Sequence, residues 1–327
     1  MSNANIIVTS AAHPAAIPCD DFGPGWYAIL ASGELPQGKP LAMTRFGLKL
    51  VAFRTSSGPG VMLDRCPHRG VQLSKGSIEA DHIVCPFHGL CFNRHGECER
   101  IPVQGEDTVI PKALRTTTFK VREQHGFIFM WWGPEPDSLP DIEWFHDELA
   151  GCDGPYEHWA ECETGLSRNI ENQMDSAHLP FVHKRSIGRL VKSPKMDVDC
   201  TVTGGRIRMF LRNGRPGFYL EMCLPNIWIN RIGAKAWVFL AFVPVTATRT
   251  RLYTRYYQGS FKVPVLKKLF GWLMGWSNLM ILREDIRIIE THDTKVSPTL
   301  DGSEFLLACD LPIIEYRRLR AKWQRPV

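Results

Sequence analysis

The sequence predicts an α+β fold in two parts, in which an all-β domain is followed by a domain that combines an antiparallel sheet with helices. Short β-rich runs bounded by Gly, Pro and Ser occupy the chain from about 25 to 133, and longer extended and helical segments follow. With 327 residues, 44% of them hydrophobic, the chain is long enough for two ordinary globular domains. We therefore predict an N-terminal segment at 1–24, a first domain at 25–135 and a second domain at 136–327.

Three β-rich runs define the first domain, at 26–30, 48–53 and 126–132. The sequence Gly133-Pro134-Glu135-Pro136 ends the last of these runs, because proline has no N–H to donate to a neighbouring strand. This stop places the predicted boundary between the two domains.

The second domain is predicted to begin with a helix over Leu166 to Leu179. Three extended segments follow, and the turn signals Gly204-Gly205, Asn213-Gly214 and Gly233 favour an antiparallel meander; the segments are 197–212, 218–231 and 235–258. A long helix is expected through 269–282 and on towards Glu290, and the tail at 313–323 has the pattern of a surface helix.

Charge and hydropathy exclude several classes of protein. The net charge of +5 is mild and no Lys/Arg block occurs, which argues against nucleic-acid binding. The apolar stretch 269–282 is shorter than the roughly 20 residues that span a bilayer, and it favours a helix that packs in a core or covers a pocket over one that contacts a membrane. Residues 1–20 show no secretory pattern and the ten cysteines are irregularly spaced, so we expect a cytoplasmic location.

Two short motifs each offer one thiolate and one imidazole. Cys66-Pro67-His68-Arg69-Gly70 is followed by Cys85-Pro86-Phe87-His88-Gly89. Two Cys and two His can hold a [2Fe–2S] cluster asymmetrically, with thiolates on one iron and imidazoles on the other. They can also hold zinc, but zinc fingers usually place a Cys pair before a His pair, whereas here each loop carries one of each. The pattern therefore favours an iron–sulfur cluster bound by Cys66, His68, Cys85 and His88.

A second group of polar residues lies at 172–183. Asn172, Asp175 and His178 are spaced by three, which would keep them near one stripe of a helix. Pro180 is expected to end or kink that helix and so turn His183 back towards His178. Two imidazoles and one distant carboxylate form the facial triad of non-haem Fe(II) oxygenases. The preferred carboxylate is Asp285 on the late helix, and its neighbour Glu284 remains an alternative.

Together, the pattern C-x-H then C-x-x-H and the pattern N-x-x-D-x-x-H-x-x-x-x-H resemble the catalytic subunits of Rieske non-haem iron oxygenases, also called aromatic ring-hydroxylating oxygenases. Rieske proteins of respiratory complexes carry an additional Cys in each loop, and Val71 and Phe87 stand at those positions here. The short chain is similar to the homotrimeric group that includes vanillate and dicamba O-demethylases and phthalate oxygenase.

The resemblance implies a Rieske domain followed by a helix-grip catalytic domain, with a [2Fe–2S] cluster and a mononuclear Fe(II) held by His178, His183 and Asp285. It also implies that Asp175, beside Asn172, connects an iron histidine to His68 or His88 of a neighbouring subunit in a homotrimer. An NAD(P)H-dependent reductase, with or without a ferredoxin, would supply electrons.

The activity that the resemblance implies is hydroxylation of a hydrophobic, cyclic substrate with O2, or demethylation through hydroxylation. The alternatives are a cis-dihydroxylating dioxygenase, a Rieske electron-transfer protein without oxygenase chemistry, and a redox-regulated sensor. For the substrate site, the alternation in 226–230 places Trp228 and Asn230 on one face of a strand. This face either lines a pocket, faces solvent or packs within the protein.

Overall fold

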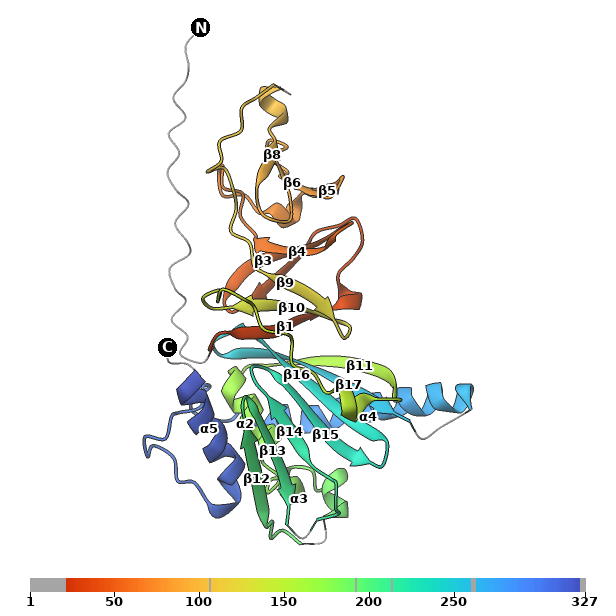
Figure 1. The fold of residues 1–327 in the computed structure, drawn as a ribbon. Helices are drawn as coiled ribbons and strands as arrows, with labels where there is room; N and C mark the ends of the chain where they lie inside the picture. Colours follow the sequence, from red (N-terminus) through yellow and green to blue (C-terminus); the bar gives the residue numbers. More distant parts are fainter. Residues whose placement is uncertain (1–21, 106, 192, 213, 260–262, 324–327) are drawn as a thin grey trace. The chain divides into compact units, whose positions relative to one another are not determined.

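The computed structural model describes residues 22–323 except 106, 192, 213 and 260–262 (Figure 1). Most of the predicted N-terminal segment, and Asn213 of one predicted turn, lie outside the described residues. The described chain forms two compact units, one of residues 29–131 and one of residues 22–28 together with 132–323.

The first unit is built from β-strands, as predicted. One sheet has the order β2-β3-β4, and its register sets Val51 opposite Met62. A second sheet has the order β5-β6-β7-β8, and β10 pairs with β1 and β9 in a third. The predicted β-runs at 26–30, 48–53 and 126–132 form β1, β3 and β10, although residues 25–28 of β1 and Trp132 of β10 belong to the second unit. The strands are β1 (Gly25–Ala31), β2 (Leu41–Arg45), β3 (Leu48–Thr55), β4 (Gly58–Leu63), β5 (Ser77–Glu79), β6 (His82–Val84), β7 (Cys91–Phe92), β8 (Cys98–Arg100), β9 (Val121–Gln124) and β10 (Phe127–Trp132).

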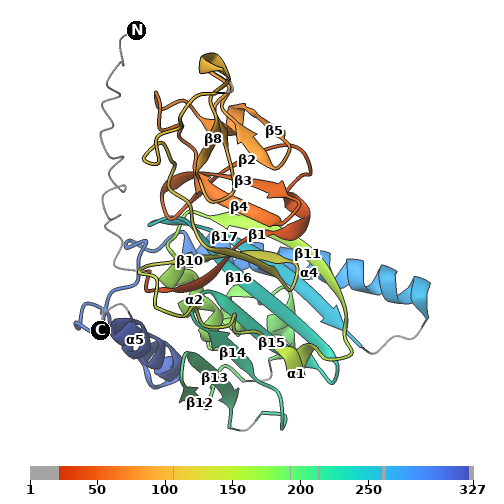
Figure 2. The same cartoon turned by 45° about the horizontal axis from the view of Figure 1, so that its top comes forward.

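The second unit combines a seven-stranded antiparallel sheet with helices, and the predicted α+β class is confirmed. The three predicted extended segments form six consecutive strands, β12 to β17, and β11 pairs with β17 at the edge. Helices α2 and α4 lie on one face of this sheet (Figure 2). The elements are α1 (His146–Leu149), β11 (Asp153–Cys162), α2 (Leu166–Met174), α3 (Leu179–Val182), β12 (Val198–Thr203), β13 (Arg206–Leu211), β14 (Leu220–Cys223), β15 (Ile227–Gly233), β16 (Ala236–Thr246), β17 (Arg249–Gln258), α4 (Pro264–Ile289) and α5 (Leu311–Trp323).

The helix predicted over 166–179 is shorter than expected. It ends at Met174, and Asp175 has an extended backbone with φ −98° and ψ 118°, so the residues at 172, 175 and 178 do not share a helical stripe. Pro180 does not end this helix but lies in the first turn of α3. A proline is tolerated there because the first N–H groups of a helix have no partner within the helix.

The long apolar helix α4 has two different faces. One face is buried against the sheet, and Tyr156 on β11 donates a hydrogen bond to the carbonyl of Lys267 (3.1 Å). On the other face Leu269, Trp272 and Trp276 are about half exposed, so the helix is only partly packed in the core. No helix in the described part of the chain is long and apolar enough to cross a membrane.

The C-terminal helix α5 packs more closely than a surface helix. Its Arg317 is buried and donates to both carboxylate oxygens of Glu171 on α2 (2.7 and 3.0 Å). Arg320 is also buried and donates to the carbonyls of Ser297 and Pro298. The basic residues that suggested a solvent-facing helix therefore hold it to its neighbours.

Candidate metal centres

The two Cys/His motifs form loops of the same construction in the first unit. The amide of Cys66 donates to the carbonyl of Val71 (2.8 Å), and the amide of Gly70 donates back to Cys66 (2.9 Å). In the second loop, Cys85 donates to Leu90 (2.8 Å) and Gly89 donates back to Cys85 (3.0 Å). Gly70 and Gly89 both adopt the left-handed backbone conformation, with φ of 77° and 71°. Each loop thus closes on itself around its cysteine and offers that side chain from a fixed backbone.

The four predicted cluster ligands divide into a buried pair and an outer pair. Cys66 and Cys85 are buried, and burial raises the pKa of Cys66 to about 12, although backbone N–H groups of His68 and Arg69 lower it in part. His68 is exposed and His88 is partly buried, and their ring centroids lie 4.8 Å apart.

The donor atoms fit an iron–sulfur cluster. The buried thiolates need positive charge beside them, and His88 Nδ1 is a buried nitrogen without a hydrogen-bond partner among the described residues. A [2Fe–2S] cluster would satisfy both requirements.

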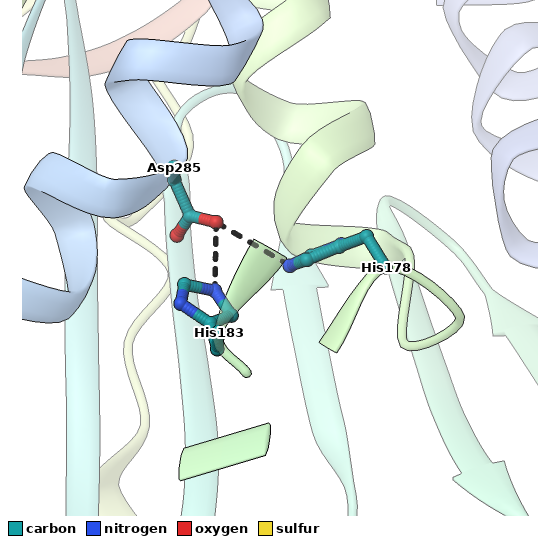
Figure 3. Close-up of side chains that lie close together, drawn as sticks. All are labelled: His178, His183 and Asp285. Atoms are coloured by element: carbon teal, nitrogen blue, oxygen red, sulfur yellow. Dashed lines mark ion pairs between the residues drawn. The ribbon is translucent and has the colours of Figure 1, made fainter. Parts of the chain in front are cut away.

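In the second unit, His178, His183 and Asp285 come together although they are far apart in the sequence. His178 precedes α3, His183 follows it, and Asp285 projects from α4 (Figure 3). Asp285 Oδ1 is 3.3 Å from His178 Nε2 and 2.9 Å from His183 Nε2. The three ligand atoms lie within 4.8 Å of one another, and two imidazoles with one carboxylate are a donor set that suits Fe(II).

The electrostatics of this group match a cation site. Burial alone would lower the pKa of His178, but the carboxylates of Asp175 and Asp285 outweigh it and raise the pKa to about 9. Burial opposes ionisation of Asp285, yet the two imidazoles hold its pKa well below the usual range. The pocket therefore favours a carboxylate beside positive charge, which a bound metal ion supplies.

The two carboxylates that the sequence left as alternatives have different positions. Glu284 does not join the group of three but accepts a hydrogen bond from His183 Nδ1 (2.7 Å) and one from the Ser186 hydroxyl (2.6 Å). This contact directs the opposite nitrogen, Nε2, towards Asp285. The side chain of Gln173 donates to Asp285 Oδ2 (3.1 Å). Gln173 and Ser186 could not be predicted from the sequence, because neither belongs to a periodic or motif pattern.

Asp175 and Asn172 lie beside the group. Asp175 Oδ2 is 3.4 Å from His178 Nδ1, but without hydrogen-bond geometry, and its Oδ1 accepts from the amide of Ala177 (2.6 Å). The side-chain Nδ2 of Asn172 is buried and has no hydrogen-bond partner among the described residues. Both residues line the same cavity as the group of three.

That cavity has a volume of about 550 Å³ and lies between the sheet and helices α2 and α4. Its walls are mainly apolar and include Leu220, Val238, Leu240 and Ile281. Trp228 and Asn230 both line it, so the strand face that the sequence left undecided faces the cavity. Met274 and Asn278 of α4 contribute on the helical side, as expected for a helix that covers a pocket.

Comparison with known proteins identifies the first unit. Residues 25–120 match the Rieske [2Fe-2S] domain. The putative toluene-4-sulfonate monooxygenase system iron-sulfur subunit TsaM2 of Comamonas testosteroni is 34% identical over 187 residues, which are 55% of this chain and 52% of that protein. A 3-ketosteroid-9-alpha-monooxygenase oxygenase component of Rhodococcus rhodochrous is 31% identical over 169 residues, or 50% of this chain and 43% of the relative. The matches thus span about half or less of these relatives.

Solved structures extend the likeness to most of the chain. NdmA of Pseudomonas putida CBB5 has a TM-score of 0.74 at 22% identity, over 90% of this chain and 89% of that one. Dicamba monooxygenase bound to dicamba has a TM-score of 0.73 at 20% identity, over 92% and 96%. The chain therefore carries a Rieske [2Fe–2S] domain, and its relatives and structural neighbours include Rieske non-haem iron oxygenases, whose fold it shares.

Proposed function

We propose that this chain is the terminal oxygenase of a Rieske non-haem iron system. It would use O2 and electrons from an NAD(P)H-dependent reductase to hydroxylate a hydrophobic, cyclic substrate, or to demethylate it through hydroxylation. The observation that carries the proposal is the group of His178, His183 and Asp285 at the wall of a cavity, in a chain that also has a Rieske domain. The proposal is also supported by its relatives, which include monooxygenase components.

The donor set of each site suits a different metal centre. Cys66, Cys85, His68 and His88 would hold the [2Fe–2S] cluster, in which neutral imidazoles reduce the negative charge and raise the reduction potential. His178, His183 and Asp285 would hold Fe(II), which supplies the activation of O2 and leaves positions open for it.

The protein's own groups orient and enclose the reaction. Glu284 fixes the ring of His183 through Nδ1, and Gln173 fixes Asp285 through Oδ2, so both ligands keep their orientation without metal. The apolar walls of the cavity exclude water and place a hydrophobic substrate beside the group of three.

We further propose that the active form is a homotrimer. In it Asp175 would join His178 to the partner subunit's His68 or His88. The proposal is supported by the exposure of His68 and by His178 Nδ1, which lies beside Asp175 and has no hydrogen-bond partner among the described residues. A head-to-tail interface that closes on itself gives a C3 ring. The electron donor, the possible ferredoxin and the cytoplasmic location remain predictions from the sequence.

The test is the content of iron and acid-labile sulfide per chain after anaerobic purification. The wild type should contain the cluster iron and sulfide and one further iron. His178→Ala should lose only that further iron, whereas His158→Ala, which removes a histidine of β11 outside the site, should lose nothing.

Other results would contradict the proposal. A wild type that holds only the cluster, even after iron reconstitution, would make the chain an electron carrier. Zinc without sulfide would exclude both the oxygenase and the electron carrier. For any substrate that is converted, mass spectrometry after reaction under ¹⁸O₂ separates the proposed monooxygenation, with one labelled oxygen, from cis-dihydroxylation, with two.

A further inference from the structure

The sheet side of the cavity is one continuous face. Along β15, Trp228, Asn230 and Ile232 line it with the two-residue period of a strand, and Arg231 also lines it where the register with β16 shifts. Trp228 lies opposite Leu240 of β16, which in turn lies opposite Thr254 of β17, and both of these also line the cavity. The face is apolar apart from a few polar atoms, whose positions therefore decide what a ligand must carry.

Trp228 brings a hydrogen-bond donor into this apolar face. The residue is 3% exposed, and its Nε1 has no hydrogen-bond partner in the described residues. An indole N–H can only donate, and a buried donor without an acceptor is costly. Buried polar groups without a partner are rare in proteins, and at a binding cavity the missing acceptor is one that a ligand can provide.

Asn278 offers a second donor from the helical side of the same cavity. It is 9% exposed, and its Nδ2 likewise lacks a partner among the residues that the structure describes. Asn278 and the proposed ligand Asp285 are seven residues apart on α4, so they lie on the same face of the helix. Their separation along the helix axis is about 10 Å, from a rise of about 1.5 Å per residue.

The charges around the cavity favour a neutral acceptor. The one Lys or Arg among the described residues that line it is Arg231, whose nitrogens donate to the backbone carbonyls of Gly217, Gly233 and Ala234 (2.9, 3.3 and 3.0 Å). The other titratable groups that line it are the three proposed iron ligands, Asp175 and Tyr219. Among the described lining residues no cation other than the proposed iron is directed at the cavity, so an anion held away from the iron would be buried without a charge partner, whereas a carbonyl oxygen needs only N–H donors.

We propose that Trp228 and Asn278 determine specificity by binding the carbonyl oxygen of a neutral, otherwise apolar substrate, such as a cyclic ketone, ester or amide. This inference rests on the proposed function, because it assigns the substrate class of the same site. The carbonyl would be held about two turns of α4 from Asp285. The oxidised carbon would therefore lie on the part of the substrate remote from the carbonyl.

The experiment measures binding, so it does not require turnover. Three probes share one ring system and differ in one group: 2-acetylnaphthalene, 2-isopropylnaphthalene and 2-naphthoate. Their dissociation constants are measured by anaerobic equilibrium dialysis with the full chain. The ketone should bind about tenfold more tightly than the hydrocarbon, as expected for hydrogen bonds to buried donors. It should also bind more tightly than the carboxylate.

Substitutions then locate the contact. Trp228→Phe and Asn278→Leu should each weaken binding of the ketone about tenfold and change binding of the hydrocarbon by less than about twofold. Trp237→Phe is the matched control, because it removes an indole N–H from the neighbouring strand β16 at a position that does not line the cavity. It should leave both affinities unchanged.

The inference is overturned if the ketone fails to bind or binds no more tightly than the hydrocarbon, if 2-naphthoate binds best, or if the variants weaken both neutral probes equally. The metal content of the same preparations is measured separately. A wild type without the further iron that still shows the ketone preference would refute the oxygenase but not the carbonyl site. A wild type that holds the further iron but shows no preference for the ketone would refute only the carbonyl site.

Discussion

The two proposed metal centres are built in opposite ways. The cluster site consists of two loops, each closed by its own backbone hydrogen bonds, and its four ligands lie between Cys66 and His88. The site of His178, His183 and Asp285 depends on packing, since Asp285 reaches it from a helix that follows the whole meander. The first site is therefore a local structure, and the second exists only when the second unit is folded.

The groups that support the ligands differ in the same sense. Backbone amides position Cys66 and Cys85, whereas side chains position the second set: Glu284 holds His183, and Gln173 holds Asp285. Substitution of a supporting side chain should therefore affect the second site. The first site should instead be affected by a substitution that disfavours the backbone conformation of its loops. The following predictions test that contrast.

The largest effect is expected from Cys85→Ser. A serine hydroxyl does not replace a thiolate ligand, so the cluster and its labile sulfide should be lost while the single further iron remains. Iron and sulfide analysis of the purified variant measures both. Loss of all iron would show that the second site depends on the first, contrary to the proposed independence.

Asp285→Ala should have the converse effect. Removal of the only carboxylate in the group of three should abolish binding of the further iron and leave the labile sulfide unchanged. Glu284→Ala is the matched control at the adjacent position, and it should retain measurable iron. Equal loss of iron in both variants would contradict the assignment of Asp285 as the ligand.

The same contrast explains what the sequence could predict. The Cys/His motifs and the order of their ligands could be predicted, because each motif lies within five consecutive residues and is recognised without knowledge of tertiary contacts. The helix that carries Asp285 was also predicted. The sequence favoured Asp285 but left Glu284 as an alternative, because neighbours on a helix point about 100° apart and only the packing of α4 decides which one faces the histidines.

Two wrong predictions and one question that the sequence left open have the same origin. The residues at 172, 175 and 178 suggested one helical stripe. Instead α2 ends at Met174, and the two histidines flank the separate short helix α3. Alternation put Trp228 and Asn230 on one face of β15. Whether that face lines a cavity depends on α2 and α4, which cover it. Basic residues of α5 resembled a solvent-facing pattern, whereas Arg317 is buried on Glu171 of a distant segment.

A supporting carboxylate should have a smaller effect than a ligand. Glu284→Gln keeps the shape of the side chain but weakens its hold on His183 Nδ1, and we expect Fe(II) affinity to fall about 10- to 100-fold, as is typical of partners of metal-bound histidine. Titration of the metal-free protein with Fe(II) under anaerobic conditions measures it. Ser186→Ala removes the hydroxyl contacts to Glu284 and to the backbone carbonyl of His183 but leaves the contact of Glu284 with His183 Nδ1, so it should cost less; an equal loss would argue that Glu284 does not act through His183.

The smallest effect concerns the loop backbone of the first site. Gly89 has φ 71°, and a Cβ there would meet Pro102 at 3.4 Å, an ordinary contact, so Gly89→Ala should cost only the left-handed backbone conformation. That penalty is about 1–2 kcal/mol in the free energy of unfolding of the first unit. Gly33→Ala is the control in the same unit, because Gly33 has no positive φ and a Cβ there would meet no atom within 4 Å. Chemical denaturation of the cluster-free protein compares the two variants.

If Gly89→Ala were as stable as Gly33→Ala, the cysteine loops would not depend on a glycine backbone. The contrast between backbone support at one centre and side-chain support at the other would then fail.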